Sequence, residues 1–477
     1  MRLRRPAATL AFATFLIVWG LITHGTYAGS GDEVHYLMIA RSLAFDGDAD
    51  LVNDYADATN LVGGGSAVPE AHLRPGRGGV LRPVHDLGLP LMAAPLVRVT
   101  YPLALWVDSA APDGWMARAK LNASLLLRHQ LSLAMALVAG WVAIEIWRAL
   151  GKAGLPQREA FWWALLMTAS PPILSYSFLF FTELIAALIV LICFRQICEP
   201  ARSPAGWLLT GVLTAWLTVI HIRNGPISLA LAVIAIARHW PRWRQLVPFA
   251  AGIAAIAAFR TAVHWHFWGT LFVNDHARLG GMSDATAIVG QSLVRASGVL
   301  LDQEFGLLAL APVYLLALPG LLNLWRHAPD IARPLSIVAG VAIGSIVLPM
   351  INPYGFVGGW SPAPRFLVPI VPLLAIAVPF GATGTAGPRR ALVWALVAVQ
   401  IAIDLVVWNE PKVLWDNADG VSAVTQALPA LQRLYAVLPT WHGPTASAWP
   451  FVWGVLLMAA VTLWLVRRQS SSIGRSQ

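Results

Sequence analysis

Two adjacent acids, Asp32 and Glu33, follow the first long apolar stretch of the chain. A carboxylate within hydrogen-bond reach of a hydroxyl group takes its proton as the oxygen attacks, so this pair could supply a general base. The apolar residues that follow recur at helical spacing, which predicts a short helix lying along a membrane surface. Ser30 and Glu33 also match a capping box, in which the acid only starts that helix. The pattern leaves both interpretations open.

A third acid, Glu183, lies near one end of another apolar stretch. A charged side chain within a membrane costs about 2.5–3.5 kcal/mol, so it usually has a partner or a function. Arg223, predicted at the same end of the helical bundle, is the expected ion-pair partner. Pairing would not exclude a functional role, because a residue of a site can be both.

Two segments that carry arginine offer positive charge for a phosphate group. Arg74 and Arg82 lie within residues 72–86, and Arg365 follows Trp360 at the start of an apolar stretch. The planar guanidinium group matches the oxygens of a phosphate, and the ring of Trp360 could stack on a sugar. A solvated loop explains the first segment equally well, but it explains Arg365 less easily.

The composition indicates which elements must position these residues. Of the 477 residues, 57% are hydrophobic and only 12% are charged, whereas soluble proteins carry about 25% charged residues. The sequence therefore predicts an all-α polytopic membrane protein, with residues 1–477 forming one integral membrane domain. The net charge of +9 comes from short basic clusters between apolar stretches. Such clusters are typical of topology control, so we expect no nucleic-acid partner.

Apolar stretches long enough to cross a membrane, about 20 residues each, recur along the chain. They fall at about residues 7–24, 124–147, 161–176, 181–197, 206–222, 226–238, 246–263, 304–324, 335–351, 366–382, 390–408 and 449–466. The basic clusters place both termini in the cytoplasm by the positive-inside rule. Four of the 24 acidic residues then face the cytoplasm, namely Glu145, Glu159, Glu199 and Asp330. This asymmetry favours an even number of spans, about twelve.

The polar residues concentrate on the outer side of this predicted bundle. They lie in a long first loop, residues 25–123, and in further loops at 264–303, 352–365 and 409–448. Residues 87–106 are apolar but interrupted by prolines, and counting them as a span would reverse every later loop. We therefore expect an interfacial or re-entrant segment there, within a cap that the loops form over the outer face.

The residues singled out above carry a resemblance to a known family. The runs GDEVHYLMIARSLAFDGDADLVNDY and HLRPGRGGVLRPVHDLGLPL resemble the first outer loop of the GT-C glycosyltransferases. The segments FTEL around Glu183, FGLLALAPVYLLALPGLL and GGWSPAPRFLVPIVPLL fit the same order. The chain is most similar to bacterial relatives of protein O-mannosyltransferase and aminoarabinose transferase, over about residues 7–382.

The resemblance implies a glycosyltransferase at the outer face of a bacterial-type inner membrane. It implies a polyprenyl-phosphate sugar as donor, a lipid, glycan or protein hydroxyl as acceptor, inversion at the anomeric carbon, and an essential acid at Asp32. On this hypothesis the catalytic acids are Asp32, as the base, and Glu33 and Glu183, as orienting or acceptor-binding carboxylates. The residues expected to bind the donor phosphate are Arg74, Arg82 and Arg365. Those expected to bind sugar or acceptor are His35, Tyr36, Arg223 and Trp360.

The resemblance leaves a divalent cation open, because some members of that family use one. Asp32, Glu33 and Glu183 offer the oxygen ligands that such a cation prefers. The pair His264 and His266 is a weaker candidate for zinc, since interfacial histidines are common.

Two other functions compete with this interpretation. A transporter or flippase of lipid-linked substrates has a similar number of helices, but the sequence shows neither an internal repeat nor charges concentrated at mid-membrane. A ligase or polymerase of lipid-linked glycans would depend on outer arginines and histidines without needing Asp32.

Overall fold

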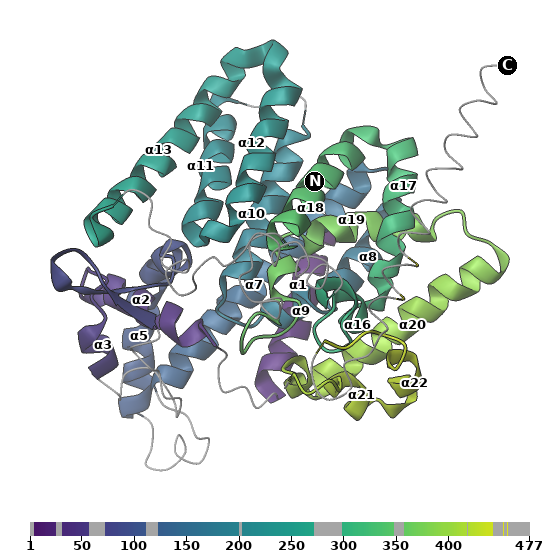
Figure 1. Ribbon diagram of the computed structural model, residues 1–477, viewed down its shortest axis with the longest axis horizontal. Helices are drawn as coiled ribbons and strands as arrows, with labels where there is room; N and C mark the ends of the chain where they lie inside the picture. The colour runs from purple at the N-terminus through teal and green to yellow at the C-terminus, as the bar shows by residue number, and fades with distance from the viewer. Residues whose placement is uncertain are drawn as a thin grey trace.

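The chain is seen here as a computed structural model that describes residues 4–24, 31–56, 72–110, 123–199, 203–270, 298–347, 357–416 and 418–441, with Val452 and Leu456. This part of the chain is mostly helical and contains a small two-stranded sheet (Figure 1). Within it, four helical runs are long and apolar enough to cross a membrane: Gly88–Ala110, Leu125–Lys152, Ile222–Trp268 and Gly387–Asn409. The protein is therefore a helical polytopic protein by length and composition, and the number twelve stays a prediction.

The apolar stretches predicted as spans coincide with helices wherever the structure describes them. The helices are α1 (Arg4–His24), α7 (Ala123–Lys152), α8 (Gln157–Thr168), α10 (Thr182–Ile197), α11 (Pro204–Ile220), α12 (Gly225–His239), α13 (Trp243–Trp268), α17 (Ala317–His327), α18 (Pro329–Val347), α19 (Val371–Ala382) and α20 (Gly387–Asn409). The stretch at 449–466 lies outside the described residues, apart from Val452 and Leu456.

Two of these stretches are interrupted, and proline accounts for each interruption. Helix α8 ends at Thr168, before Pro171 and Pro172, and the single turn α9 (Ile173–Tyr176) follows. The stretch from residue 304 divides into α16 (Leu307–Leu310), the 3-10 segment η4 (Pro312–Leu316) and α17. Proline lacks the backbone N–H of a helix interior and disfavours helical geometry in the residue before it.

The first predicted loop contains a small substructure of its own. It begins with α2 (Glu33–Phe45), the helix expected from the apolar spacing, and continues through α3 (Val52–Ala56). Strands β1 (Leu73–Pro75) and β2 (Leu81–Pro83) flank the 3-10 turn η1 (Arg77–Gly79) and pair antiparallel, with Arg74 opposite Arg82. Figure 1 shows this hairpin beside α2 and α3, next to the end of α13.

Residues 87–106 form most of a continuous helix, α5 (Gly88–Ala110), despite two internal prolines. The helix packs against α2, α7 and α11. Its first residue lies against the end of α11, where a Cβ atom on Gly88 would approach the backbone nitrogen of Ile220 to 2.4 Å. Length and composition alone would let α5 span a membrane, so its interfacial placement stays a prediction.

Helix α10 lies in the core of the bundle. Every one of its residues except Arg195 is buried, as expected for a helix that is apolar on all sides. Its first turn carries Glu183, so the fold buries this acid at the start of α10.

The other ends of α10 and α12 carry a separate group of charges. Arg195 donates to Glu145 at 2.5 Å and to Glu199 at 3.0 Å, and Arg238 lies 3.7 Å from Asp330. These three acids are among the four expected in the cytoplasm. The structure therefore separates them from the acids near the start of α10.

Candidate functional site

Arg365 joins three segments that are far apart in the sequence. It precedes α19, in the 3-10 segment η6 (Arg365–Leu367). Its Nη2 donates to Oδ2 of Asp32 at 2.5 Å, and its Nε donates to Oε1 of Glu183 at 2.7 Å. Its Nη1 donates to the carbonyl oxygen of Gly358 at 3.1 Å. The guanidinium group thus holds the residue before α2, the first turn of α10 and its own loop together.

Glu183 also forms an ion pair with a second arginine, Arg223. Arg223 donates to the same oxygen, Oε1, so the predicted ion pair is present. Thr182 Oγ1 donates to Oε2 at 3.1 Å, and the guanidinium group of Arg223 lies 4.7 Å from the ring centre of Phe366. The Glu183 side chain is fully buried. A buried carboxylate is tolerated when it is paired and hydrogen-bonded, and two arginines meet that need here.

Asp32 differs from the other two acids in its exposure. Its side chain is 25% exposed, against 0% for Glu183. Burial alone would raise the pKa of the Asp32 carboxyl group, but the charge and hydrogen bond of Arg365 outweigh this and hold the pKa well below its usual value. Asp32 is therefore an ionised carboxylate whose side chain is partly exposed.

Glu33 points away from this cluster, into the protein. Its Oε1 accepts a hydrogen bond from the backbone nitrogen of Phe180 at 2.8 Å, and its Oε2 lies 3.8 Å from Nε of Arg128. The side chain is 1% exposed. Glu33 thus ties the start of α2 to the segment before α10. Ser30, its predicted capping partner, lies outside the described residues.

The predicted carboxylate metal site does not fit this geometry. Arg365 binds both Asp32 and Glu183, so a cation shared by these acids would have to displace it. Glu33 is engaged elsewhere. The second candidate, His264 with His266, lies within α13. Residues two positions apart on an α-helix are separated by about 200° around the helix axis. The two rings therefore lie on nearly opposite faces and cannot bind one ion together.

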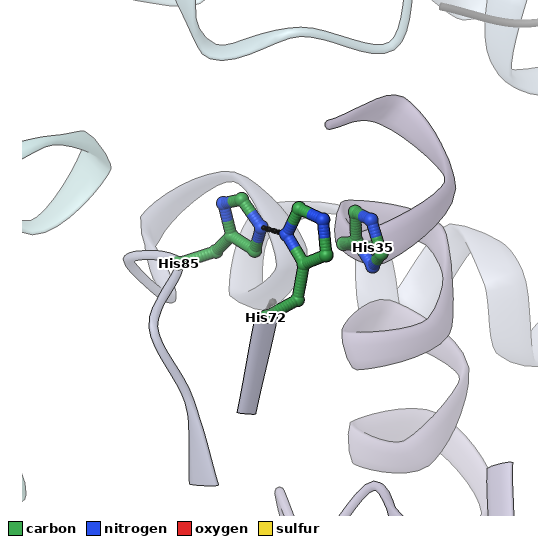
Figure 2. A group of neighbouring side chains, drawn as sticks. All are labelled: His35, His72 and His85. Carbon is green, nitrogen blue, oxygen red and sulfur yellow. Dashed lines mark hydrogen bonds between the residues drawn. The ribbon is translucent and has the colours of Figure 1, made fainter. Parts of the chain in front are cut away.

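Three histidines of the first loop do come together. His35 is on α2, His72 directly precedes β1, and His85 follows β2 (Figure 2). Burial, helped by the neighbouring histidines, lowers the pKa of His35 to about 3, so its ring is neutral. Sequence reasoning assigned His35 to sugar binding and missed the cluster. The signal lies in the hairpin, because pairing of Leu73 with Pro83 brings the flanking histidines together.

The contacts seen for the two hairpin arginines involve residues other than those of the Arg365 cluster. The guanidinium group of Arg82 lies 4.7 Å from the ring centre of Phe267, at the end of α13. Arg74 donates through Nη1 to the carbonyl oxygen of Leu73 at 2.7 Å. The role of Arg74 and Arg82 as phosphate partners stays a prediction. The two arginines that lie together are Arg365 and Arg223, which both bind Glu183.

Two predicted aromatic contacts differ in accessibility. The Tyr36 side chain is buried and packs edge-on against Phe181 and His85, so it supports the site from within. Trp360 is 58% exposed. Its carbonyl oxygen lies so close to Gly31 that a Cβ there would approach it to 2.7 Å. An exposed indole ring therefore belongs to the loop beside Asp32.

A pocket lies between the start of α5 and the ends of α11 and α13. Its polar lining includes Asp86, Arg260 and His264, and it also includes His85 of the histidine cluster. The backbone of Ile222 donates to Asp86 Oδ2 at 3.0 Å and closes one side. The pocket shares no lining residue with the carboxylate–arginine cluster, so it is a neighbouring feature.

Chemically, the arrangement can bind an anion and accept a proton. Arg223 and Arg365 both pair with the buried acid Glu183, and Arg365 also pairs with the partly exposed acid Asp32. No family model, curated protein or solved structure matches this chain. Its function must therefore be argued from these residues.

Proposed function

We propose that this chain is a membrane glycosyltransferase that moves a sugar from a polyprenyl-phosphate carrier to an acceptor hydroxyl group. The observation that carries the proposal is the pairing of Asp32, the reachable acid, with Arg365, which also binds the buried acid Glu183. A base and a cation lie side by side there, as sugar transfer from a phosphate requires.

The proposed reaction assigns a separate task to each of these groups. The acceptor oxygen bonds to the anomeric carbon and gives its proton to Asp32, while the bond from that carbon to the phosphate oxygen breaks. The phosphate leaves with the bonding electrons and needs positive charge near its oxygens more than it needs a proton. Arg365 and Arg223 supply that charge. Attack from the face opposite the phosphate inverts the anomeric carbon.

Arg365 also couples donor binding to the strength of the base. Its charge keeps the pKa of Asp32 low, which makes the carboxylate a weak base when no substrate is bound. A donor phosphate competes with Asp32 for the guanidinium group. As the arginine turns to the phosphate, the pKa of Asp32 rises and the carboxylate becomes a better proton acceptor.

The remaining acids act as positioning residues in this proposal. Glu183 holds both arginines through one oxygen, and Glu33 fixes the start of α2 through the backbone of Phe180. Neither side chain is accessible to a substrate. The exposed ring of Trp360 is the surface offered to a sugar.

We place this site on the outer face of a bacterial-type inner membrane, with both termini in the cytoplasm. Support comes from the basic residues around the opposite ends of α10 and α12, namely Arg148, Lys152, Arg195 and Arg238. Basic clusters favour the cytoplasmic side, so the Asp32 end would face outward.

Mass spectrometry of membrane lipids and envelope glycans tests the proposal. The strains are wild type, a deletion, and the deletion carrying Asp32→Asn, Arg365→Lys or the control Asp46→Asn, an exposed acid of the same loop. The deletion, Asp32→Asn and Arg365→Lys strains should lose one glycan modification and accumulate a polyprenyl-phosphate sugar. The control should match wild type.

Other outcomes would favour the competing functions. Loss in Arg365→Lys with normal modification in Asp32→Asn would favour a ligase or polymerase of lipid-linked glycans. If the deletion has a phenotype and both Asp32→Asn and Arg365→Lys restore normal glycans, a transporter or flippase would be favoured. The assignment of Asp32 as the base would then be wrong.

A further inference from the structure

The histidine cluster of the first loop has the make-up of a metal site. The rings of His35 and His72 stack with centres 3.5 Å apart, and Nδ1 of His72 lies 2.9 Å from Nε2 of His85. One ring nitrogen from each histidine lies within 4.8 Å of the other two. Figure 2 shows the three side chains side by side, with the dashed line joining His72 to His85. Imidazole nitrogen is the ligand that zinc and similar divalent ions favour.

The distances are close to those that an ion would impose. Two nitrogens bound to one tetrahedral zinc ion lie about 3.3 Å apart, given Zn–N bonds of about 2.0–2.1 Å. The contact between His72 and His85 needs to open by only a few tenths of an ångström to admit the ion. The widest separation in the cluster needs to close by at most about 1.5 Å, which ring rotations can supply.

Tyr55 prepares His35 for this role. Its hydroxyl group hydrogen-bonds to Nδ1 of His35, which leaves Nε2 of the same ring for a metal. Histidines that bind metals generally make such a bond through their other nitrogen, and the bond fixes the ring orientation. Tyr55 lies in α3, the short helix after α2. Its hydrogen bond to His35 therefore also joins α3 to α2.

The hairpin is a small substructure that a bound ion would stabilise. Each strand has only three residues, and two short strands are marginally stable alone in water. The hairpin packs on α2 through a small buried cluster of Ile39, Leu51 and Leu73, separate from the main core. A metal ion is one means by which such a small substructure gains stability.

We propose that His35, His72 and His85 bind one divalent ion of the zinc class, with a fourth position open to water. The ion fixes the hairpin onto α2, three residues after Asp32. The site shares no residue with the carboxylate–arginine cluster, whose members are Asp32, Glu183, Arg223 and Arg365. It does not depend on glycosyl transfer, since metal content is measured without a transfer assay.

The experiment uses the full-length protein in detergent without a polyhistidine tag. Zn²⁺ is added, the excess is removed, and bound metals are counted by plasma mass spectrometry. Wild type should hold about one Zn²⁺ per chain, and its thermal midpoint should rise with Zn²⁺. Both effects should be lost in His72→Gln and in His85→Gln, and Tyr55→Phe should weaken binding by about 10–100-fold. His264→Gln is the matched control and should bind like wild type.

A conservative variant separates loss of a ligand from loss of the fold. His72→Cys supplies another good zinc ligand and should recover binding that His72→Gln loses. The proposal is overturned if wild type holds no Zn²⁺, if His264→Gln removes it, or if folded His72→Gln and His85→Gln, with native elution in size-exclusion chromatography, keep it. A different ion bound by the same histidines, seen in the same measurement of the untreated protein, would support the site and name its metal.

Discussion

Arg365 donates to Asp32 across a separation of 333 positions in the sequence, at 2.5 Å. The same guanidinium group donates to Glu183 through a different nitrogen, so the reachable acid and the buried acid share one cation. Removing the arginine would leave two acids without a shared partner. Removing Asp32 leaves the arginine still held by Glu183. The two substitutions therefore have unequal structural costs, which shapes the experiments below.

The first prediction concerns the coupling of Asp32 with Arg365. Asp32→Asn should lower the rate of sugar transfer by about 10²–10⁴-fold, the usual contribution of a general base. Adding Arg365→Lys should lower it by much less than the product of the single effects, because the two residues act as a unit. Initial rates in membranes, with the accumulated lipid as donor, give the comparison. Effects that simply multiply would contradict the proposed coupling.

The second prediction separates Glu33 from its neighbour. Glu33→Ala removes the acceptor of the buried Phe180 N–H, and an unsatisfied buried donor costs about 1–3 kcal/mol. The thermal midpoint should therefore fall, and Glu33→Gln, which keeps an acceptor oxygen, should recover part of the loss. Transfer per folded molecule should stay within about tenfold of wild type, far above that of Asp32→Asn. If a stable Glu33 variant lost as much transfer activity as Asp32→Asn does, Glu33 would have a catalytic role.

The third prediction concerns Glu183 as the holder of two arginines. Glu183→Gln keeps the shape and one acceptor oxygen but removes the charge that Arg365 and Arg223 share. Because these arginines then lose their fixed position, we expect the donor KM to rise by about tenfold or more, together with a lower thermal midpoint. Glu159→Gln, an exposed acid of α8, is the control. An unchanged KM with normal stability would remove Glu183 from the site.

The sequence predicted some of these relationships and concealed others, for physical reasons. Apolar length located the helices, and the cost of a charge in lipid indicated that Glu183 needed a partner such as Arg223. The tie between Glu33 and Phe180 was hidden because the donor is a backbone group, which no residue type signals. The histidine cluster depended on a hairpin of three-residue strands, too short for alternation of apolar residues to reveal.

The fourth prediction is a pH dependence of stability that arises from Asp302. This buried acid accepts hydrogen bonds from the backbone nitrogens of Phe305 and Trp441, so it holds the segment that ends at Trp441 against the start of α16. Burial raises the pKa of its carboxyl group to about 6. A folded-state pKa above the unfolded value contributes stability at low pH, and this stability is lost as the pH rises through about 6.

Wild type should therefore lose roughly 1–2 kcal/mol of stability from this group between pH 5 and pH 7.5. In Asp302→Asn the pH dependence should be smaller by that amount, whereas the exposed control Glu159→Gln should keep it. Thermal midpoints in one detergent across this range supply the measurement. Equal pH dependence in wild type and Asp302→Asn would show that another group is responsible.

The last prediction concerns the placement of α5, whose length alone suits a membrane span. Both of its ends are tied to elements at the Asp32 end of the bundle. Gly88 lies against Ile220, the last residue of α11, and Asp108 accepts from the backbone of Ala123, the first residue of α7. Helix α7 has 30 residues and is about 45 Å long, more than the roughly 30 Å of hydrocarbon it would cross. On the proposed topology we expect its first turns to extend beyond the membrane, with α5 beside that extension.

Cysteine labelling with a membrane-impermeant reagent tests this placement in a chain whose Cys193 and Cys198 are replaced. Ser109→Cys, at the end of α5, should label from the same side as Asn53→Cys, next to the histidine cluster. Ser203→Cys, at the start of α11, should label from the opposite side. If Ser109→Cys labelled from the side opposite to Asn53→Cys, α5 would cross the membrane. The number of spans would then be odd, and the two termini would lie on opposite sides.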